Sequence, residues 1–223
     1  MTGYHTLLAL DFDETLAPTY QFSIPAWENF MAEWLITHGL FATAAEARQH
    51  MHSLDNPYGC GPTFMARQFG KNKAFIEAFY QAVSPLILQA NLVGNLQVHP
   101  QLKPQLQRLQ AAGYYPIIIS QGHRDFILPI LKHLQLADLF NPTQVVDRAH
   151  KRLEPLGYQV AKALTMHLNL QQFIMCDDSA PNFPHAKAEG FTTVLIHPAP
   201  AEEALAQADH HFPDLLSYLE TLK

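Results

Sequence analysis

The sequence predicts an α/β fold, a doubly wound parallel sheet with a helical domain inserted after the first strand. Three observations indicate this. After Pro100, short apolar runs rich in β-branched residues alternate with helical segments, as in a parallel sheet covered on both faces. Residues 5–10 form an apolar run typical of a buried strand. Between residues 18 and 96 the apolar spacing is helical, without a clear strand. We therefore expect a sheet domain over residues 1–16 and 97–223, and a helical domain over residues 17–96.

The helical domain begins with an amphipathic segment. Its apolar residues fall at i, i+3, i+4, i+7 and i+8 and end before Gly39; they are Trp27, Phe30, Met31, Trp34 and Leu35. We interpret its aromatic residues as domain core rather than as a substrate cage. Thr43-Ala-Ala-Glu46 is a capping-box pattern and predicts a second helix. Turn residues predict a loop over 55–62. A third helix is expected over about 73–90, interrupted or bent near Pro85.

The sheet domain continues with alternating elements. The predicted strands after the first are 114–120, 144–147, 172–176 and 192–196, the last being the final clear strand. The predicted helices are one through Leu102, Leu106 and Leu109 that Gly113 closes, one through Ile130, Leu131 and Leu134, and two more over 155–168 and 181–189. Because proline is best tolerated in the first turn of a helix, we expect Pro129 there.

Composition excludes several classes of protein. The net charge is −6 and no basic run occurs, so nucleic acid and anionic membranes are not expected partners. No apolar run reaches the roughly 18 residues of a membrane span, and the N-terminal residues lack the form of a signal peptide. Two cysteines make no disulfide framework, which favours the cytoplasm. The 13 histidines are scattered without an HExxH or CxxC motif, so a zinc site is not expected.

Polar residues follow the predicted strands where each of them ends. Asp11, Asp13 and Thr15 follow the first strand, Ser120 and Gln121 the second, and Asp177 and Asp178 the fourth. In a parallel sheet these ends meet at one edge, where ligands bind. Four converging carboxylates would repel one another, and Mg²⁺ would resolve the repulsion through oxygen ligands. Aspartates also cap turns and helices, but two pairs at equivalent strand ends weaken that alternative.

These residues resemble the motifs of the haloacid dehalogenase-like hydrolases. Asp11-Phe-Asp-Glu-Thr15 resembles motif I (DxDxT), Ser120 resembles motif II, and Asp177-Asp178-Ser179 with the helix after it is similar to motif IV. A helical insertion between motifs I and II is typical of the C1-capped members. The resemblance covers about 1–16 and 97–212. Glu14 replaces the commoner glycine, and the motif III lysine falls in the ambiguous stretch His150-Lys151-Arg152-Leu-Glu-Pro155.

The resemblance implies catalysis through an aspartyl phosphate on a small phosphomonoester, such as a sugar phosphate or a nucleoside monophosphate. Asp11 would be the nucleophile and Asp13 the acid and base, and Thr15, Ser120 and Gln121 would bind the phosphoryl group. Mg²⁺ would be held by Asp11, the Asp13 carbonyl and Asp178, with Asp177 close by. Counting back from Pro155 favours Arg152 as the motif III cation, but we prefer Lys151, because a compact ammonium can bridge Asp11 and a phosphoryl oxygen.

Several alternatives remain at this point. Dehalogenases and phosphonatases of the family lack the second motif I aspartate, which is present here as Asp13. A phosphomutase or phosphotransferase needs the same core and stays open. A non-catalytic binding protein on this fold is disfavoured by the complete set of aspartates. His123 is expected either to touch substrate or to lie in a solvated loop, and Asn182 is expected to brace the motif IV loop.

Overall fold

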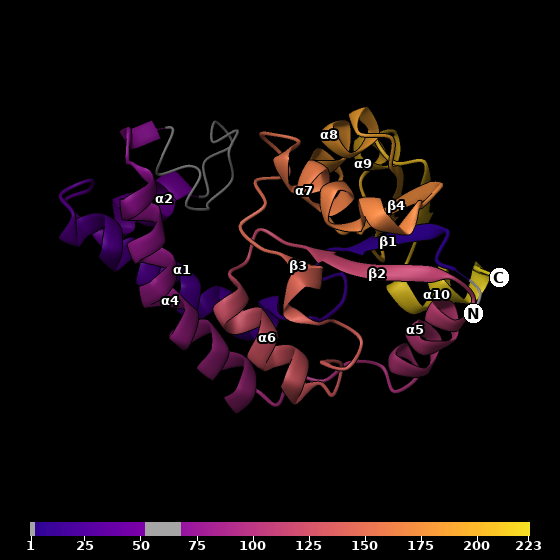
Figure 1. The fold of residues 1–223 in the computed structure, drawn as a ribbon. Coiled ribbons are helices and arrows are strands. Elements are labelled where there is room, and N and C mark those ends of the chain that lie inside the picture. Colours follow the sequence, from indigo (N-terminus) through magenta and orange to yellow (C-terminus); the bar gives the residue numbers. More distant parts are fainter. Residues whose placement is uncertain (1–2, 52–67) are drawn as a thin grey trace. The chain divides into compact units, whose positions relative to one another are not determined.

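The computed structural model describes residues 3–51 and 68–223 (Figure 1). The chain divides into two compact units, one of residues 1–18 and 96–223 and the other of residues 19–95. The loop predicted over 55–62 lies outside the described residues. In the part of the chain that is described, no helix is both long and apolar enough to cross a membrane.

The first unit contains a six-stranded, all-parallel sheet in the order β3-β2-β1-β4-β5-β6. Its strands are β1 (Thr6–Leu10), β2 (Tyr114–Ile119), β3 (Val145–Val146), β4 (Gln172–Asp177), β5 (Thr192–Ile196) and β6 (His210–Phe212). The predicted α/β class is confirmed. The segment 192–196 was the last clear strand of the sequence, and one further strand that was not predicted, β6, follows it. This short edge strand contains two histidines and lacks the apolar run by which buried strands are recognised.

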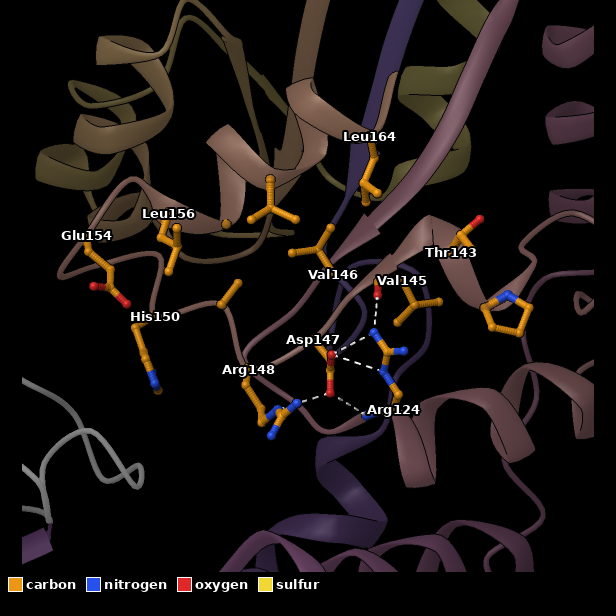
Figure 2. Close-up of a pocket in the computed structure, with 14 residues that line it drawn as sticks. Arg124, Thr143, Val145, Val146, Asp147, Arg148, His150, Glu154, Leu156 and Leu164 are labelled. Carbon is orange, nitrogen blue, oxygen red and sulfur yellow. Dashed lines mark hydrogen bonds and ion pairs between the residues drawn. The ribbon is translucent and has the colours of Figure 1, made fainter. Parts of the chain in front are cut away.

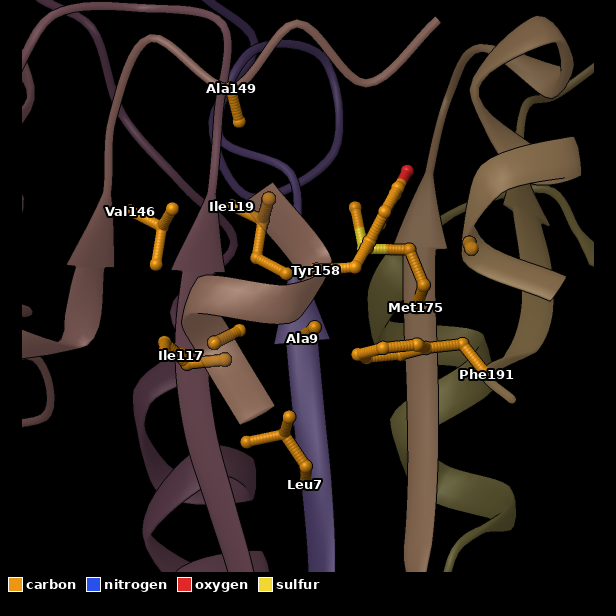
Figure 3. Packing of buried hydrophobic residues seen from close by; sticks show 11 residues of the cluster. Leu7, Ala9, Ile117, Ile119, Val146, Ala149, Tyr158, Met175 and Phe191 are labelled. Atoms are coloured by element: carbon orange, nitrogen blue, oxygen red, sulfur yellow. The ribbon is translucent and has the colours of Figure 1, made fainter. Parts of the chain in front are cut away.

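Helices cover both faces of the sheet (Figure 1). The helices of this unit are α5 (Leu102–Ala111), α6 (Arg124–His133), α7 (Leu156–Thr165), α8 (Phe183–Ala188), α9 (Glu202–Leu205) and α10 (Leu215–Thr221). Figure 1 shows α7 and α8 on one face and α5 and α10 on the other. On the α7 face, alternate residues of the central strands pack against Tyr158 and Ala161 of α7 (Figure 3). Because both faces are buried, β1 is apolar without alternation.

The chain changes direction in the sheet between β1 and β4. From β1 it proceeds outward to β2 and β3, then returns to place β4 on the other side of β1. Leu10 is in register with Cys176 of β4, and the Asp11 amide donates to the Cys176 carbonyl at 2.8 Å. Asp11 and Asp177, which follow these two residues, are therefore brought to the crevice where ligands bind in such sheets.

Helix α6 corrects one expectation. It begins at Arg124, so Pro129 lies in its middle and not in its first turn. The start is fixed by His123, whose Nδ1 accepts a hydrogen bond from the Asp125 amide at 3.2 Å. A histidine is an uncommon N-cap, so the sequence carries little signal for a helix that starts here.

The second unit is helical in its described part. It contains α1 (Tyr20–Thr37), α2 (Ala44–Met51) and α4 (Lys73–Val93), which precede β2 in sequence, so the predicted helical insertion is confirmed. The ends of α1 and α2 follow local rules. Gly39, in the left-handed region at φ 69°, donates to Ile36, and Leu40 donates to Leu35, which is a Schellman ending. Thr43 and Glu46 exchange the predicted capping-box hydrogen bonds at 3.2 Å.

Helix α4 runs through Pro85 without a break, so the interruption considered from the sequence is wrong. Directly before this proline, the Ser84 hydroxyl donates to the Tyr80 carbonyl at 2.6 Å. The aromatic rings of this unit pack together, as expected for its core. Phe30 and Trp34 of α1 lie 5.6 and 5.7 Å from Phe79 of α4, measured between ring centroids.

Candidate active site

Asp11 follows β1 directly and is buried, with 8% of its surface exposed. Its Oδ1 accepts from the Phe12 amide at 2.8 Å and lies 2.9 Å from Lys151 Nζ. In the described part of the chain, Oδ1 takes all hydrogen bonds and ion pairs of this carboxylate. The carboxylate is thus fixed through one oxygen, Oδ1.

The loop after Asp11 turns sharply. Leu16 and Ala17 both donate their amides to the Phe12 carbonyl, and Glu14 lies in the left-handed region at φ 57°. A side chain in that region costs about 1 kcal/mol or more relative to glycine. Glycine would therefore suit this position, and the glutamate there donates its amide to the Ala17 carbonyl at 2.9 Å. Asp13 is carried by this turn and is half-buried.

Lys151 is fully buried between two carboxylates. Its Nζ lies 2.9 Å from Asp11 Oδ1 and 2.5 Å from Asp177 Oδ2. Burial alone would lower the pKa of Lys151, but the charges of Asp11 and Asp177 raise it well above its ordinary value. The ammonium therefore stays charged. Arg152 is partly exposed, so the cation brought to Asp11 is the residue that the chemical argument favoured.

Asp177 ends β4 and is also fully buried. Besides Lys151, the Asn182 amide group donates to both of its oxygens at 2.9 and 3.0 Å, and the Ser179 amide donates at 2.9 Å. Tyr158 in turn donates its hydroxyl to the backbone carbonyl of Asn182 at 3.0 Å. Asn182 has the bracing contacts expected of it. Sequence reasoning did not find Tyr158, because an aromatic residue on an amphipathic helix is indistinguishable from core.

Asp178 completes an acidic cluster. One carboxylate oxygen from each of Asp11, Asp177 and Asp178 lies within 4.8 Å of the other two. Burial, followed by the charge of Asp177, raises the pKa of Asp178 to about 7. Burial likewise raises the pKa of Asp11 well above its ordinary value, although Lys151 opposes the shift. A bound cation would offset the repulsion between these carboxylates and favour their ionised forms.

The donor set fits a hard divalent cation, because carboxylate oxygens are its preferred ligands. Both Asp177 oxygens already accept hydrogen bonds, so Asp11 and Asp178 are the better placed ligands. The carboxylate of Asp13 is not in the cluster found among the described residues.

The predicted phosphate-binding residues differ in exposure. Ser120 is buried, and its Oγ accepts from the Gly122 amide at 2.9 Å, so its hydroxyl hydrogen remains to be donated. Gln121 is exposed. The Thr15 hydroxyl is buried and has no hydrogen-bond partner among residues 3–51 and 68–223. In that range, neither hydroxyl is hydrogen-bonded to the acidic cluster.

Two further residues complete the comparison with sequence. His123 is buried at the start of α6, so its interpretation as a solvated loop residue is wrong. Asp147, directly after β3, was missed as a candidate although it occupies the same kind of position as Asp11. The signal was present in the sequence, an aspartate at the end of a strand, but β3 is only two residues long.

Known proteins resemble this chain in sequence and in fold. The family model for haloacid dehalogenase-like hydrolases matches residues 5–190. No curated protein matches the sequence. A hydrolase from Pseudomonas syringae is similar in structure, with a TM-score of 0.68, 16% identity and 97% of each chain covered. CbbY from Rhodobacter sphaeroides, solved with phosphate, has a TM-score of 0.65 at 14% identity, with 94% of each chain covered.

A haloacid dehalogenase-like family protein from Streptococcus pneumoniae is similar over 100% of both chains, with a TM-score of 0.62 and 17% identity. At these identities the solved structures show the shared fold, while the family match spans most of the sequence, including the segments that carry Asp11, Lys151 and Asp178. The chain therefore belongs to the haloacid dehalogenase-like hydrolases, a family of enzymes.

Proposed function

We propose that this protein is a Mg²⁺-dependent phosphohydrolase that cleaves a small phosphomonoester through an aspartyl phosphate. The observation that carries the proposal is the position of Lys151, buried between Asp11 and Asp177 beside the carboxylate of Asp178. This arrangement holds a carboxylate nucleophile next to a permanent cation and a candidate metal site. Residues 1–16 and 97–223 would form the catalytic domain, and residues 17–96 would form a C1 cap that selects the substrate. We place the enzyme in the cytoplasm.

In the first chemical step, Asp11 Oδ2 attacks phosphorus as the bond from phosphorus to the leaving oxygen breaks. Asp13 gives its proton to that oxygen. In the second step, Asp13 takes a proton from water as the water oxygen attacks phosphorus. The acyl phosphate bond breaks, releasing inorganic phosphate and restoring the Asp11 carboxylate. Splitting the hydrolysis in this way replaces one difficult step by two easier ones.

The remaining residues neutralise and orient the phosphoryl group. Lys151 faces Asp11 and would donate to a phosphoryl oxygen as charge develops there. The hydroxyls of Thr15 and Ser120 and the amide of Gln121 would donate to the other phosphoryl oxygens. Asp11, the Asp13 carbonyl and Asp178 would hold Mg²⁺, with Asp177 next to them. When bound, the ion supplies charge that offsets the repulsion between the carboxylates and the phosphate.

The first test is the hydrolysis of p-nitrophenyl phosphate with Mg²⁺, followed by a screen of phosphorylated metabolites for released inorganic phosphate. Turnover that Asp11→Asn abolishes supports the proposal. A phosphomutase, the alternative with the same core, would return an isomerised monophosphate without stoichiometric phosphate release. Complete inactivity toward every phosphomonoester would contradict the proposed chemistry.

Metal dependence gives a separate prediction. Asp178→Ala removes one carboxylate from the acidic cluster, so Mg²⁺ affinity and turnover should fall together. EDTA should abolish wild-type turnover, and added Mg²⁺ should restore it. Titration calorimetry and initial rates measure the two effects. Asp138→Ala is the control, because that aspartate lies on the surface and pairs with Lys103. Full wild-type activity in metal-free buffer would exclude the metal.

The acid role of Asp13 is tested by the choice of leaving group. Asp13→Asn should slow phosphorylation of the enzyme by a sugar phosphate more than by p-nitrophenyl phosphate, because a nitrophenolate leaves without protonation. Phosphoenzyme should accumulate, since the variant also lacks the base for hydrolysis. Rapid-quench measurements with both esters give the phosphorylation rate constants. An equal loss for the two esters would argue against proton donation by Asp13.

A further inference from the structure

Asp147 lies directly after β3 and is held from several sides (Figure 2). Its Oδ1 accepts from Arg124 Nε and from an Arg124 terminal nitrogen, at 3.1 and 3.0 Å. Its Oδ2 lies 3.2 Å from Arg148 Nε and 3.3 Å from the Arg124 amide nitrogen. Only 5% of the Asp147 side chain is exposed. Two nitrogens of Arg124 therefore donate to a single oxygen of Asp147, a contact that we call the fork. The carboxylate is buried, whereas 43% of the Arg124 side chain is exposed. Charge-assisted hydrogen bonds of this kind are stronger than neutral ones and fix orientation as well as distance.

Asp147 is held in its charged form by the arginines around it. Burial alone would raise the pKa of the carboxyl, but hydrogen bonds from Arg124 and the charge of Arg148 hold it below its ordinary value. The same Arg124 terminal nitrogen also donates to the Val145 carbonyl at 3.0 Å. The start of α6 is therefore tied to the end of β3 through a side chain and through the backbone.

The segment after β3 and the loop before α6 each carry a proposed site residue, Lys151 and Ser120 respectively. Beyond β3, the Arg148 amide donates to the Gly122 carbonyl at 2.9 Å, and the Ala149 amide donates to the Ser120 carbonyl at 2.8 Å. The chain then turns tightly, with the Lys151 amide donating to the Ala149 carbonyl at 2.8 Å. Lys151 thus follows a backbone segment whose position is set by its contacts with the Ser120 loop.

This segment includes an unfavourable conformation. Arg148 lies in the left-handed region at φ 53°, which costs a residue other than glycine on the order of 1 kcal/mol. Such a conformation persists only where its surroundings hold it. Two contacts hold Arg148 in this conformation. Its side chain pairs with the Asp147 carboxylate, and its amide donates to the Gly122 carbonyl.

We propose that Asp147, through its fork with Arg124, is a positioning residue that holds the segment 147–151 against the Ser120 loop and so places Lys151 on Asp11. The inference rests on the proposed phosphohydrolase function for its effect on rate, but its structural part does not. Asp147 acts through Lys151 and takes no part in the chemistry itself. Displacement of a catalytic group by about 1 Å is enough to cost about 100-fold in rate.

The test compares Asp147→Asn with Asp209→Asn. Asp209 is a matched control, because it also joins two elements, accepting from the Thr193 amide and hydroxyl at 2.8 Å and from Lys187 at 2.8 Å. It precedes β6 at the opposite edge of the sheet from β3. We expect Asp147→Asn to lower kcat about 10- to 100-fold with KM within about threefold, and Asp209→Asn to change kcat less than about twofold.

A double-mutant cycle identifies the fork. Asp147→Asn with Arg124→Gln should lose little more activity than the worse single variant, because both changes break the same contact. Additive losses of kcat would show that the two residues act separately and would overturn the proposed fork.

A second measurement does not require turnover. Trace acetic anhydride in metal-free buffer, read by peptide mass spectrometry, reports the accessibility of Lys151 relative to exposed Lys132. Acetylation of Lys151 should rise several-fold in Asp147→Asn and stay at the wild-type level in Asp209→Asn. Unchanged acetylation in Asp147→Asn, or equal loss of kcat in both variants, overturns the inference. If the wild-type protein hydrolyses no phosphomonoester, the proposed function fails, and acetylation alone decides whether Asp147 positions Lys151.

Discussion

Asp11→Asn should lower kcat for phosphomonoester hydrolysis by on the order of 10³-fold or more while the fold stays intact. The reason is chemical, because an amide is a far weaker nucleophile than a carboxylate and loss of one member of a catalytic unit removes most of its rate. The substitution preserves shape. The carbonyl of the introduced asparagine can still accept from the Phe12 amide and from Lys151, as Oδ1 of Asp11 does now.

Steady-state kinetics, with circular dichroism and thermal unfolding as checks on folding, measure this effect. Asp138→Asn is the control, the same chemical change on an exposed carboxylate that pairs with Lys103. Radiolabelled phosphate from the substrate should become bound to the wild-type protein and not to Asp11→Asn. Near-normal turnover by Asp11→Asn would remove Asp11 as the nucleophile, and with it the proposed mechanism.

Lys151→Ala should cost about 30- to 1,000-fold in kcat/KM, whereas Arg152→Ala should have little effect. Loss of one charge-assisted contact in the transition state is worth about 2–4 kcal/mol, which gives that range of rates. Lys151 has the geometry for such a contact, since its Nζ lies 2.9 Å from Asp11 Oδ1. Arg152 is partly exposed and serves as the matched neighbour.

Removal of Lys151 also leaves two buried carboxylates without their cation, so the variant should unfold more readily. Breaking a buried ion pair by removing one partner costs about 3–5 kcal/mol. Lys151→Met, which keeps the aliphatic volume, is therefore measured in parallel, with rates corrected for the folded fraction. A large loss in Arg152→Ala with normal activity in both Lys151 variants would move the cation by one residue. Normal activity in Lys151→Ala, Lys151→Met and Arg152→Ala would show that another residue supplies the cation.

Much of the fold was determined locally. The apolar run of β1, the capping box of Thr43 and Glu46 and the ending of α1 at Gly39 depend on neighbours in sequence, and the structure confirms them. The positions of the acidic residues also follow from sequence. Because parallel strands end at one edge, aspartates after β1 and β4 must approach one another once those strands are recognised.

The elements that were missed have weak local signals. Strand β6 has three residues, two of them histidines, and it is stabilised by pairing with β5 rather than by its own apolar pattern. The start of α6 depends on a histidine cap. Because this cap was not recognised in the sequence, Pro129 was wrongly predicted to lie in the first turn of the helix. In each case contacts with the rest of the structure outweigh propensity.

The choice between Lys151 and Arg152 could not come from sequence alone. Adjacent residues in a loop point in different directions, and the direction depends on the backbone path. Here that path is set by hydrogen bonds from the segment after β3 to the Ser120 loop, and by the left-handed conformation of Arg148. The sequence by itself determined which chemical groups are present and which strands carry them. Only the tertiary structure decided which cation lies between Asp11 and Asp177, because that contact joins residues far apart in the chain.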